Sequence, residues 1–390
     1  MNGTALNKTD LAAWRSLLAR PNASSLLVAA TLYLVSSLIL PLATNESLCL
    51  LFVVACAAFY YMQTRTISSL ILPAIPAMLL FTLGGSMMLP AAFFAIVFGG
   101  TSGAMLLLSA RTVRHDAVLV LLPVAAYTGA ILLGASPAVA CLALFPLPVA
   151  VVAALAVRRC TAFTSAVAIL SGVIGAGLLA ALLIPLAING LLDVSLLPAF
   201  VDTLGDTLIA MLEEATALYA EAGVTIEISE MAIRNLLSEL INLSPAILAL
   251  VAMVTAYFTW RILCVLLTSF GMLPRLPRIM VIPTMSVIAA CLFLIAYLTA
   301  LVANAEAVTP VGAVALNLSL ILEPGLALVG VGNLLRRDAP RSCFSLLALV
   351  LLVYLVWSNP ATALALAAFF GALHVLLLAY QNTKNRKGEQ

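Results

Sequence analysis

Glu323, Pro324 and Gly325 stand together inside an apolar run that reads LSLILEPGLALVGVGN over residues 318–333. A carboxylate near mid-membrane costs several kcal/mol unless it is paired, hydrated or protonated, so acidic residues at this depth are candidate functional groups. Pro324 has no N–H to donate to Leu320, and it disfavours helical dihedrals at Glu323. We therefore predict an interrupted membrane helix that exposes carbonyls and an ionisable side chain, as transporters use to bind ions and substrates.

Two further polar residues are candidates to complete this site. Asn317 belongs to the same predicted helix and can supply a polar ligand or satisfy freed backbone groups. His374 and Glu323 each lie about 13 residues from the predicted outer end of their spans, which is roughly 20 Å deep. A Glu–His pair at one depth can hold a proton or a polar substrate group.

Structural alternatives exist for both ionisable residues. Pro324 can simply kink the helix, with Glu323 a neutral, hydrogen-bonded acid facing a neighbouring helix. His374 can donate to a backbone carbonyl and have no role in binding. The sequence leaves these alternatives open.

The composition indicates a membrane protein. Of the 390 residues, 64% are hydrophobic and 9% are charged, and the mean hydropathy is +1.19. Soluble domains carry about 25% charged residues, so this chain could not keep a globular surface wet. The net charge is +2, and the basic residues form small clusters between apolar runs, with no extended patch for nucleic acid.

The apolar runs predict twelve membrane spans, most of them long enough to cross a hydrocarbon core of about 30 Å. The second and third are short, and a re-entrant pair is the alternative for them, although the distribution of basic residues favours two full spans. The predicted spans are 24–42, 47–63, 67–84, 88–109, 117–134, 137–157, 163–190, 244–269, 280–303, 309–335, 342–358 and 361–380. With the N-terminus inside, all but one of the 18 basic residues fall on the inner side, and the exception is Arg234. This asymmetry places both termini in the cytoplasm.

Residues 191–243 form the only long segment without a predicted span. The segment is acidic, its apolar residues from Leu197 onward recur at helical spacing, and a second helix is predicted to begin after Ser229. We expect an outer amphipathic segment that covers loop ends or folds over the bundle as a lid. The predicted fold is thus an all-α polytopic bundle. Its two membrane parts are an N-terminal bundle at 24–190 and a C-terminal bundle at 244–380, which contains the broken helix at 323–325. The remaining parts are a cytoplasmic segment at 1–23, the outer segment at 191–243 and a cytoplasmic tail at 381–390.

The predicted spans of the N-terminal half differ in composition from those of the C-terminal half. Its spans contain no acidic residue and are interrupted by glycines and prolines, which favours close helix packing around a neutral, aromatic interior. The whole sequence lacks a P-loop, an HExxH motif, a dinucleotide-binding glycine turn and a nucleophile–base arrangement. No enzymatic activity or cofactor is predicted.

The C-terminal half carries a family resemblance. The run AYFTWRILCVLLTSFGMLPRLPRIMVIPTMS at 256–286 precedes the span LNLSLILEPGLALVG at 316–330. This order resembles the YybS-like (DUF2232) family of bacterial membrane proteins over about 196–380, with the loop 271–278 as its most characteristic piece. That family often has Gln-Gly-Leu where this chain has Pro324, Gly325 and Leu326.

The N-terminal half of that family is similar to the substrate-binding S components of energy-coupling-factor vitamin transporters. The resemblance implies a small helical bundle that captures a nutrient and associates with separate energising subunits. Here Ser25 and Ala29 offer the four-residue spacing of small residues that faces the coupling subunit in those proteins.

We predict a multi-pass protein of the bacterial cytoplasmic (inner) membrane that binds or moves a small solute. Glu323 and Pro324 form the predicted site, assisted by Asn317 and His374, and the expected partners are the lipid bilayer, a small-molecule solute and energising subunits. One alternative is a scaffold or regulator that binds a protein through the outer segment. Another is an enzyme or carrier that acts on a lipid head group.

Overall fold

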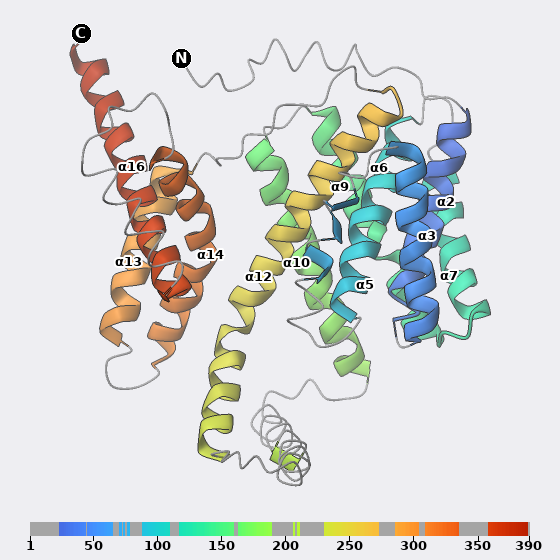
Figure 1. Cartoon of the computed structure of the whole chain (residues 1–390), viewed down its shortest axis with the longest axis horizontal. Helices are drawn as coiled ribbons and strands as arrows, with labels where there is room; N and C mark the ends of the chain where they lie inside the picture. The colour runs from blue at the N-terminus through green and yellow to red at the C-terminus, as the bar shows by residue number, and fades with distance from the viewer. Residues whose placement is uncertain are drawn as a thin grey trace. The chain divides into compact units, whose positions relative to one another are not determined.

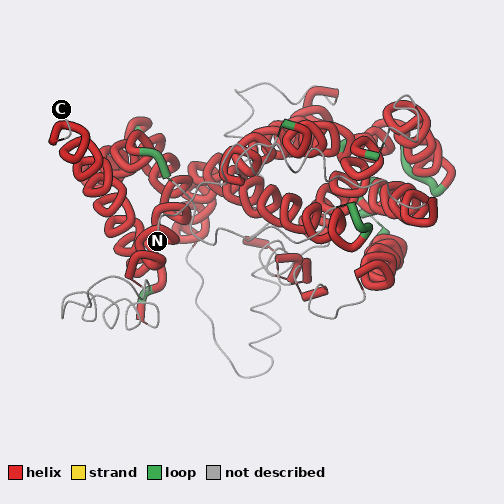
Figure 2. The backbone as a smooth tube through the Cα atoms, turned by 90° about the horizontal axis from the view of Figure 1, so that it is seen from above, coloured by secondary structure: helices red, strands yellow, loops and turns green. Residues whose placement is uncertain are grey.

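A computed structural model shows a chain built from helices (Figures 1 and 2). Among the described residues there is no strand, which confirms the predicted all-α class. The structure describes residues 23–43, 45–64, 70–71, 73–74, 76–78, 88–109, 117–159, 163–188, 206, 209–210, 230–272, 285–303, 309–334 and 358–388.

The described residues contain seven helices that are long and apolar enough to cross a membrane, and three shorter apolar helices. Each of them overlaps a predicted span, whereas 342–357 and most of 67–84 lie outside the described residues. The helices are α2 (Ala23–Ile39), α3 (Glu46–Thr64), α5 (Met88–Phe94) with η1 (Ala95–Gly99) and α6 (Gly100–Leu108), η2 (Ala117–Leu121) with α7 (Leu122–Leu132), α8 (Pro137–Ala140) with η3 (Cys141–Leu144) and α9 (Pro146–Arg158), α10 (Phe163–Ile188), α12 (Glu230–Ser269), α13 (Val287–Ala303), α14 (Pro310–Leu334) and α16 (Pro360–Gly388).

Short polar side chains fix where several helices begin. A side-chain oxygen just before the helix accepts the N–H of the residue three positions on, which satisfies one free donor of the first turn. These pairs are Ser286 with Ala289 at 3.1 Å, Thr309 with Gly312 at 3.1 Å, and Asn359 with Thr362 at 3.2 Å. The sequence thus sets the starts of α13, α14 and α16 locally.

The described chain divides into two compact units. The first unit is Met1–Asn189 with Val251–Ile279, and the second is Gly190–Leu250 with Met280–Gln390. This division differs from the predicted bundles at 24–190 and 244–380. The reason is that α12 continues through Pro245 as one helix, and one face of it from Ala252 onward, including Ala256, Ile262 and Leu266, is buried in the core of the first unit.

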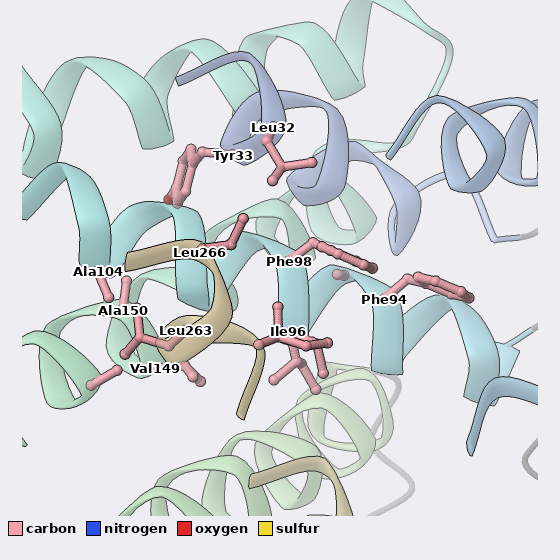
Figure 3. Close-up of a cluster of buried hydrophobic side chains, with 14 of the residues drawn as sticks. Leu32, Tyr33, Phe94, Ile96, Phe98, Ala104, Val149, Ala150, Leu263 and Leu266 are labelled. Atoms are coloured by element: carbon pink, nitrogen blue, oxygen red, sulfur yellow. The ribbon is translucent and has the colours of Figure 1, made fainter. Parts of the chain in front are cut away.

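The core of the first unit surrounds the helix formed by α5, η1 and α6. Within the span Pro90–Leu108, 89% of the residues are buried, compared with 17% for Glu46–Thr64. The middle of this helix, η1, is a π-helical turn. Figure 3 shows side chains of the central helix, Phe94, Ile96 and Phe98, packed with side chains of three neighbouring helices. The neighbouring side chains are Leu32 and Tyr33 of α2, Val149 and Ala150 of α9, and Leu263 and Leu266 of α12.

Glycines allow the neighbours of this central helix to approach closely. A Cβ atom on Gly99 would lie 2.6 Å from the Cβ of Pro146, and one on Gly103 would lie 2.7 Å from the Cβ of Ala150. Inside a membrane, such close approach replaces the hydrophobic driving force that assembles helices in water. The close packing predicted from the small residues of the N-terminal half is confirmed here.

The second unit packs α13, α14 and α16 around a small core. Met285 lies beside Gly325, whereas Thr299 and Pro310 line one groove, so α13 and α14 are antiparallel. α14 and α16 lie side by side and run in the same direction (Figure 1). Their contact is tightest where Gly330 meets Gly371.

We predict that Gly330→Ala destabilises the protein by about 1–3 kcal/mol, as overpacking does in well-packed cores. A Cβ atom at Gly330 would overlap the backbone carbonyl of Ala367, which cannot move aside as a flexible side chain would. Thermal unfolding in detergent measures the change. Gly172→Ala is the matched control, because its Cβ would meet nothing within 4 Å; equal unfolding midpoints for the two variants would contradict the packing described.

Candidate functional site

Glu323 lies on the buried face of α14, near the middle of the helix. This face follows helical spacing through Gly312, Ala315, Ser319, Glu323, Leu326 and Gly330. The side chain of Glu323 is 7% exposed, and Leu326, one turn further on, is fully buried. None of the hydrogen bonds and ion pairs between described residues involves the Glu323 carboxyl group. The structure therefore places an ionisable group in an apolar interior without a protein partner in the described ranges.

Pro324 does not interrupt α14. The helix is continuous from Pro310 to Leu334 with Pro324 inside it, so the predicted broken helix at 323–325 is wrong. Pro324 still removes one hydrogen bond, the one to the Leu320 carbonyl. The packing of the next turn, with Leu326 and Ala327 buried in the core of the second unit, holds the chain in helical form across the proline. Membrane helices tolerate proline where neighbouring helices support them.

Asn317 joins α14 to α12. Its carboxamide Oδ1 accepts the backbone N–H of Ala246 at 2.9 Å, and its Nδ2 donates to the carbonyl of Asn242 at 2.6 Å. The same Nδ2 also donates to the Ala313 carbonyl within α14 at 2.8 Å. In an undisturbed α-helix, the Ala246 N–H and the Asn242 carbonyl would pair with each other. The side chain of Asn317 thus bonds both groups of one helical step in α12.

This bridge lies next to Pro245, the proline inside α12. Pro245 cannot donate to the carbonyl of Ile241, so the helix is weakened at the step that Asn317 bonds. The structure therefore assigns Asn317 the second of its two predicted roles, since it satisfies backbone groups. Two of these groups, the Ala246 N–H and the Asn242 carbonyl, belong to the neighbouring helix α12, and the third is the Ala313 carbonyl of α14 itself. Pro245 was the signal in the sequence that could have predicted this role. A proline within an apolar helix weakens the backbone hydrogen bonding around it, and a polar side chain from another helix can then bond the neighbouring backbone groups.

His374 is half-buried on α16 and is engaged in an interaction of its own. Its depth can be compared with that of Glu323 through the contact of Gly330 with Gly371. Glu323 precedes this contact by seven residues and His374 follows it by three. Since the two helices run in the same direction, their positions differ by roughly 15 Å along the axis at the α-helical rise. The predicted Glu323–His374 pair is not brought together.

A groove of about 410 Å³ runs between α13 and α14. Its lining is apolar except for the hydroxyl of Thr299, and it extends along α14 from Pro310 to Leu318. Glu323 is not among its lining residues. The groove therefore gives no polar route to the carboxyl group and is suited to hydrocarbon chains.

Metal-ligand chemistry finds no support in the part of the chain that the structure describes. No group of three or more His, Cys, Asp or Glu side chains there is arranged to hold a metal ion.

No protein-family model matches the sequence, and neither a curated protein nor a solved structure matches it.

We predict that Asn317→Ala lowers the free energy of unfolding by about 1–2 kcal/mol, since three hydrogen bonds are lost and one can re-form between Ala246 and Asn242. Ser319→Ala is the matched control, because Ser319 is buried on the same helix and donates only locally, to the Leu316 carbonyl at 2.8 Å. Thermal unfolding with circular dichroism provides the measurement. A smaller loss for Asn317→Ala than for Ser319→Ala would show that the bridge to α12 is unimportant.

Proposed function

We propose that this chain is a multi-pass membrane protein with a transport-related role, in which Glu323 handles a small solute or the ion that accompanies it. The observation that supports this role is the burial of the Glu323 carboxyl group in the middle of α14, without a hydrogen bond or ion pair among the described residues. A group of this kind imposes a cost on the fold. Selection for packing alone would favour Gln or Leu at such a position.

The continuity of α14 changes how this site would work. A broken helix would offer several free carbonyls to a ligand, whereas the continuous helix offers the carboxyl group and the single freed carbonyl of Leu320. Such a site is suited to one proton or one cationic or amino group of a solute. It is less suited to a multidentate cation, which needs six or more oxygen ligands.

The finer features of the proposal come from the sequence. They are twelve spans with both termini in the cytoplasm of a bacterial inner membrane, membership of the YybS-like (DUF2232) family, and an S-component-like N-terminal bundle. In this proposal the protein is not an enzyme and uses no cofactor, so energy for transport comes from an ion gradient or from separate energising subunits. The clustering of basic residues on one predicted side supports the orientation.

Native mass spectrometry of the purified full chain tests the proposal. We expect the wild-type protein to retain a small molecule, and Glu323→Gln to reduce its occupancy by at least roughly tenfold, because a charge-assisted hydrogen bond is lost. The substitution keeps the shape of the side chain, so expression and thermal stability should be kept or improved.

Glu239→Gln is the control variant, because Glu239 is exposed on α12 and carries the same charge. Its occupancy should equal that of the wild type. Retention of the same small molecule by Glu323→Gln at wild-type occupancy would argue against a solute site at this residue.

A second candidate function is a scaffold or regulator that binds a protein partner outside the membrane. It is favoured by the length of α12, whose candidate membrane span begins at Asn242 although the helix begins at Glu230. The additional turns expose Met231, at 73% of its surface, along with Asn235 and Glu239. Methionine side chains are flexible and frequent at protein-binding surfaces, so an exposed methionine on the part of α12 beyond its membrane span favours binding of another protein there.

Deletion of residues 196–239 separates the two functions, because it leaves in place Asn242, whose carbonyl bonds Asn317. The scaffold function predicts loss of the partner from affinity-purified membranes, while Glu323→Gln retains it. The transport-related role predicts the reverse sensitivity, with solute occupancy reduced by Glu323→Gln as stated above and retained in the deletion. Quantitative mass spectrometry of both preparations reads out the two effects together.

A further inference from the structure

The groove between α13 and α14 has the size of a ligand site. Its volume is about 410 Å³, within the range of roughly 300–1,000 Å³ that small-molecule pockets occupy. Nine described residues line it, whereas a stable protein–protein interface takes about 20–30 residues from each side. The groove is therefore too small to be the interface with a second copy of the chain, and it fits a small ligand.

Two alanines form the floor of the groove. Ala296 of α13 and Ala315 of α14 are the buried members of the lining. The larger side chains beside them remain open, since Ile295 is 63% exposed and Val314 is 68% exposed. The groove is thus a shallow channel with a floor of small residues and walls of branched apolar residues, and it is accessible from outside the second unit.

The lining offers no free polar side chain to a ligand. The hydroxyl of Thr299 is its one side-chain polar group among the described residues, and Oγ1 donates to the Ile295 carbonyl at 2.8 Å within α13. Pockets for polar molecules place a few polar groups that fix the orientation of the ligand. The ligand that matches this groove is therefore a hydrocarbon.

The groove begins at one end of a membrane span. Pro310 is the first residue of α14 and of its candidate span, and the lining extends from there to Leu318. This part of the helix rises by roughly 12 Å, and one leaflet contributes about half of a hydrocarbon core of about 30 Å. The groove therefore covers most of the hydrocarbon depth of one leaflet.

We propose that this groove binds one acyl chain of a membrane lipid, with the head group at the Pro310 end and the terminal methyl group near Leu292 and Leu318. A lipid chain is already in hydrocarbon, so burial alone gives no preference for the groove. The preference comes from packing, because a narrow space without partner atoms forfeits dispersion contacts along its lining and one chain supplies them. This site does not depend on the proposed role of Glu323.

Photoactivatable lipids test the site in a bilayer. The full chain is reconstituted into phosphatidylcholine vesicles that contain a small fraction of phosphatidylcholine with a diazirine in one acyl chain. Mass spectrometry of peptides then maps the labelled residues. Ile295 and Leu298 are the matched pair, because they lie within one turn of α13 and are 63% and 60% exposed, and Ile295 lines the groove whereas Leu298 does not.

We expect the label at Ile295 to exceed that at Leu298 by at least roughly threefold, because a chain held by packing stays longer beside the lining. Moving the diazirine from the head-group end of the chain to the terminal methyl group should shift the label from Val311 towards Leu292. The opposite shift would contradict the proposed orientation.

Filling the groove should abolish the difference. Ala296→Leu places a larger side chain on the floor and should bring the ratio of label at Ile295 and Leu298 close to one. Ala176→Leu is the matched control, because Ala176 is exposed on α10 and does not line the groove. It should keep the wild-type ratio. Thr299→Leu is a second filling variant for the case in which Ala296→Leu fails to fold, since the Thr299 hydroxyl bonds within its own helix.

The wild-type ratio can overturn the site without any variant. Equal label at Ile295 and Leu298 would show freely exchanging lipid only. Weaker label at Ile295 would show that a protein segment covers the groove. An unchanged ratio in a folded filling variant would also overturn the site, because the chain would then bind elsewhere.

Discussion

Hydrocarbon offers no hydrogen-bond partners, so each polar group inside this protein must find one within the chain or in a ligand. Most polar side chains here meet the constraint locally. Ser36, Thr101 and Thr259 each donate to the carbonyl four residues earlier in their own helix. Asn317 meets it across two helices, by bonding both backbone groups beside a proline. The exceptions are few among the described residues, and they are informative because the same rule makes them costly.

Glu323 and the Tyr60 hydroxyl are two such exceptions, and they belong to different units. The second unit holds a buried acid on the packed face of α14 without a partner among the described residues, and the first holds a buried tyrosine hydroxyl without a hydrogen bond.

The sequence predicted what depends on local pattern. Hydropathy located the described apolar helices, and Glu230, the residue after the predicted cap Ser229, is helical in α12. Prediction from the sequence failed where the conformation or contacts of a residue depend on packing between two helices. The continuity of α14 depends on burial of Leu326 against its neighbours, and the role of Asn317 depends on Pro245, 72 residues earlier in the chain. The depth of His374 relative to Glu323 depends on the register of α14 and α16, which a glycine contact fixes and which hydropathy does not encode.

The π-helical turn at η1 has a consequence for how this chain tolerates changes in length. A π-turn holds one more residue than an α-turn, so a lineage that lost one residue between Ala95 and Gly99 would keep the rest of the central helix in phase. Elsewhere in Pro90–Leu108, the same deletion would rotate every later side chain by about 100°. It would turn the face that carries Gly103 away from Ala150 and Tyr33. Within the central helix, indels among distant relatives should therefore concentrate at η1.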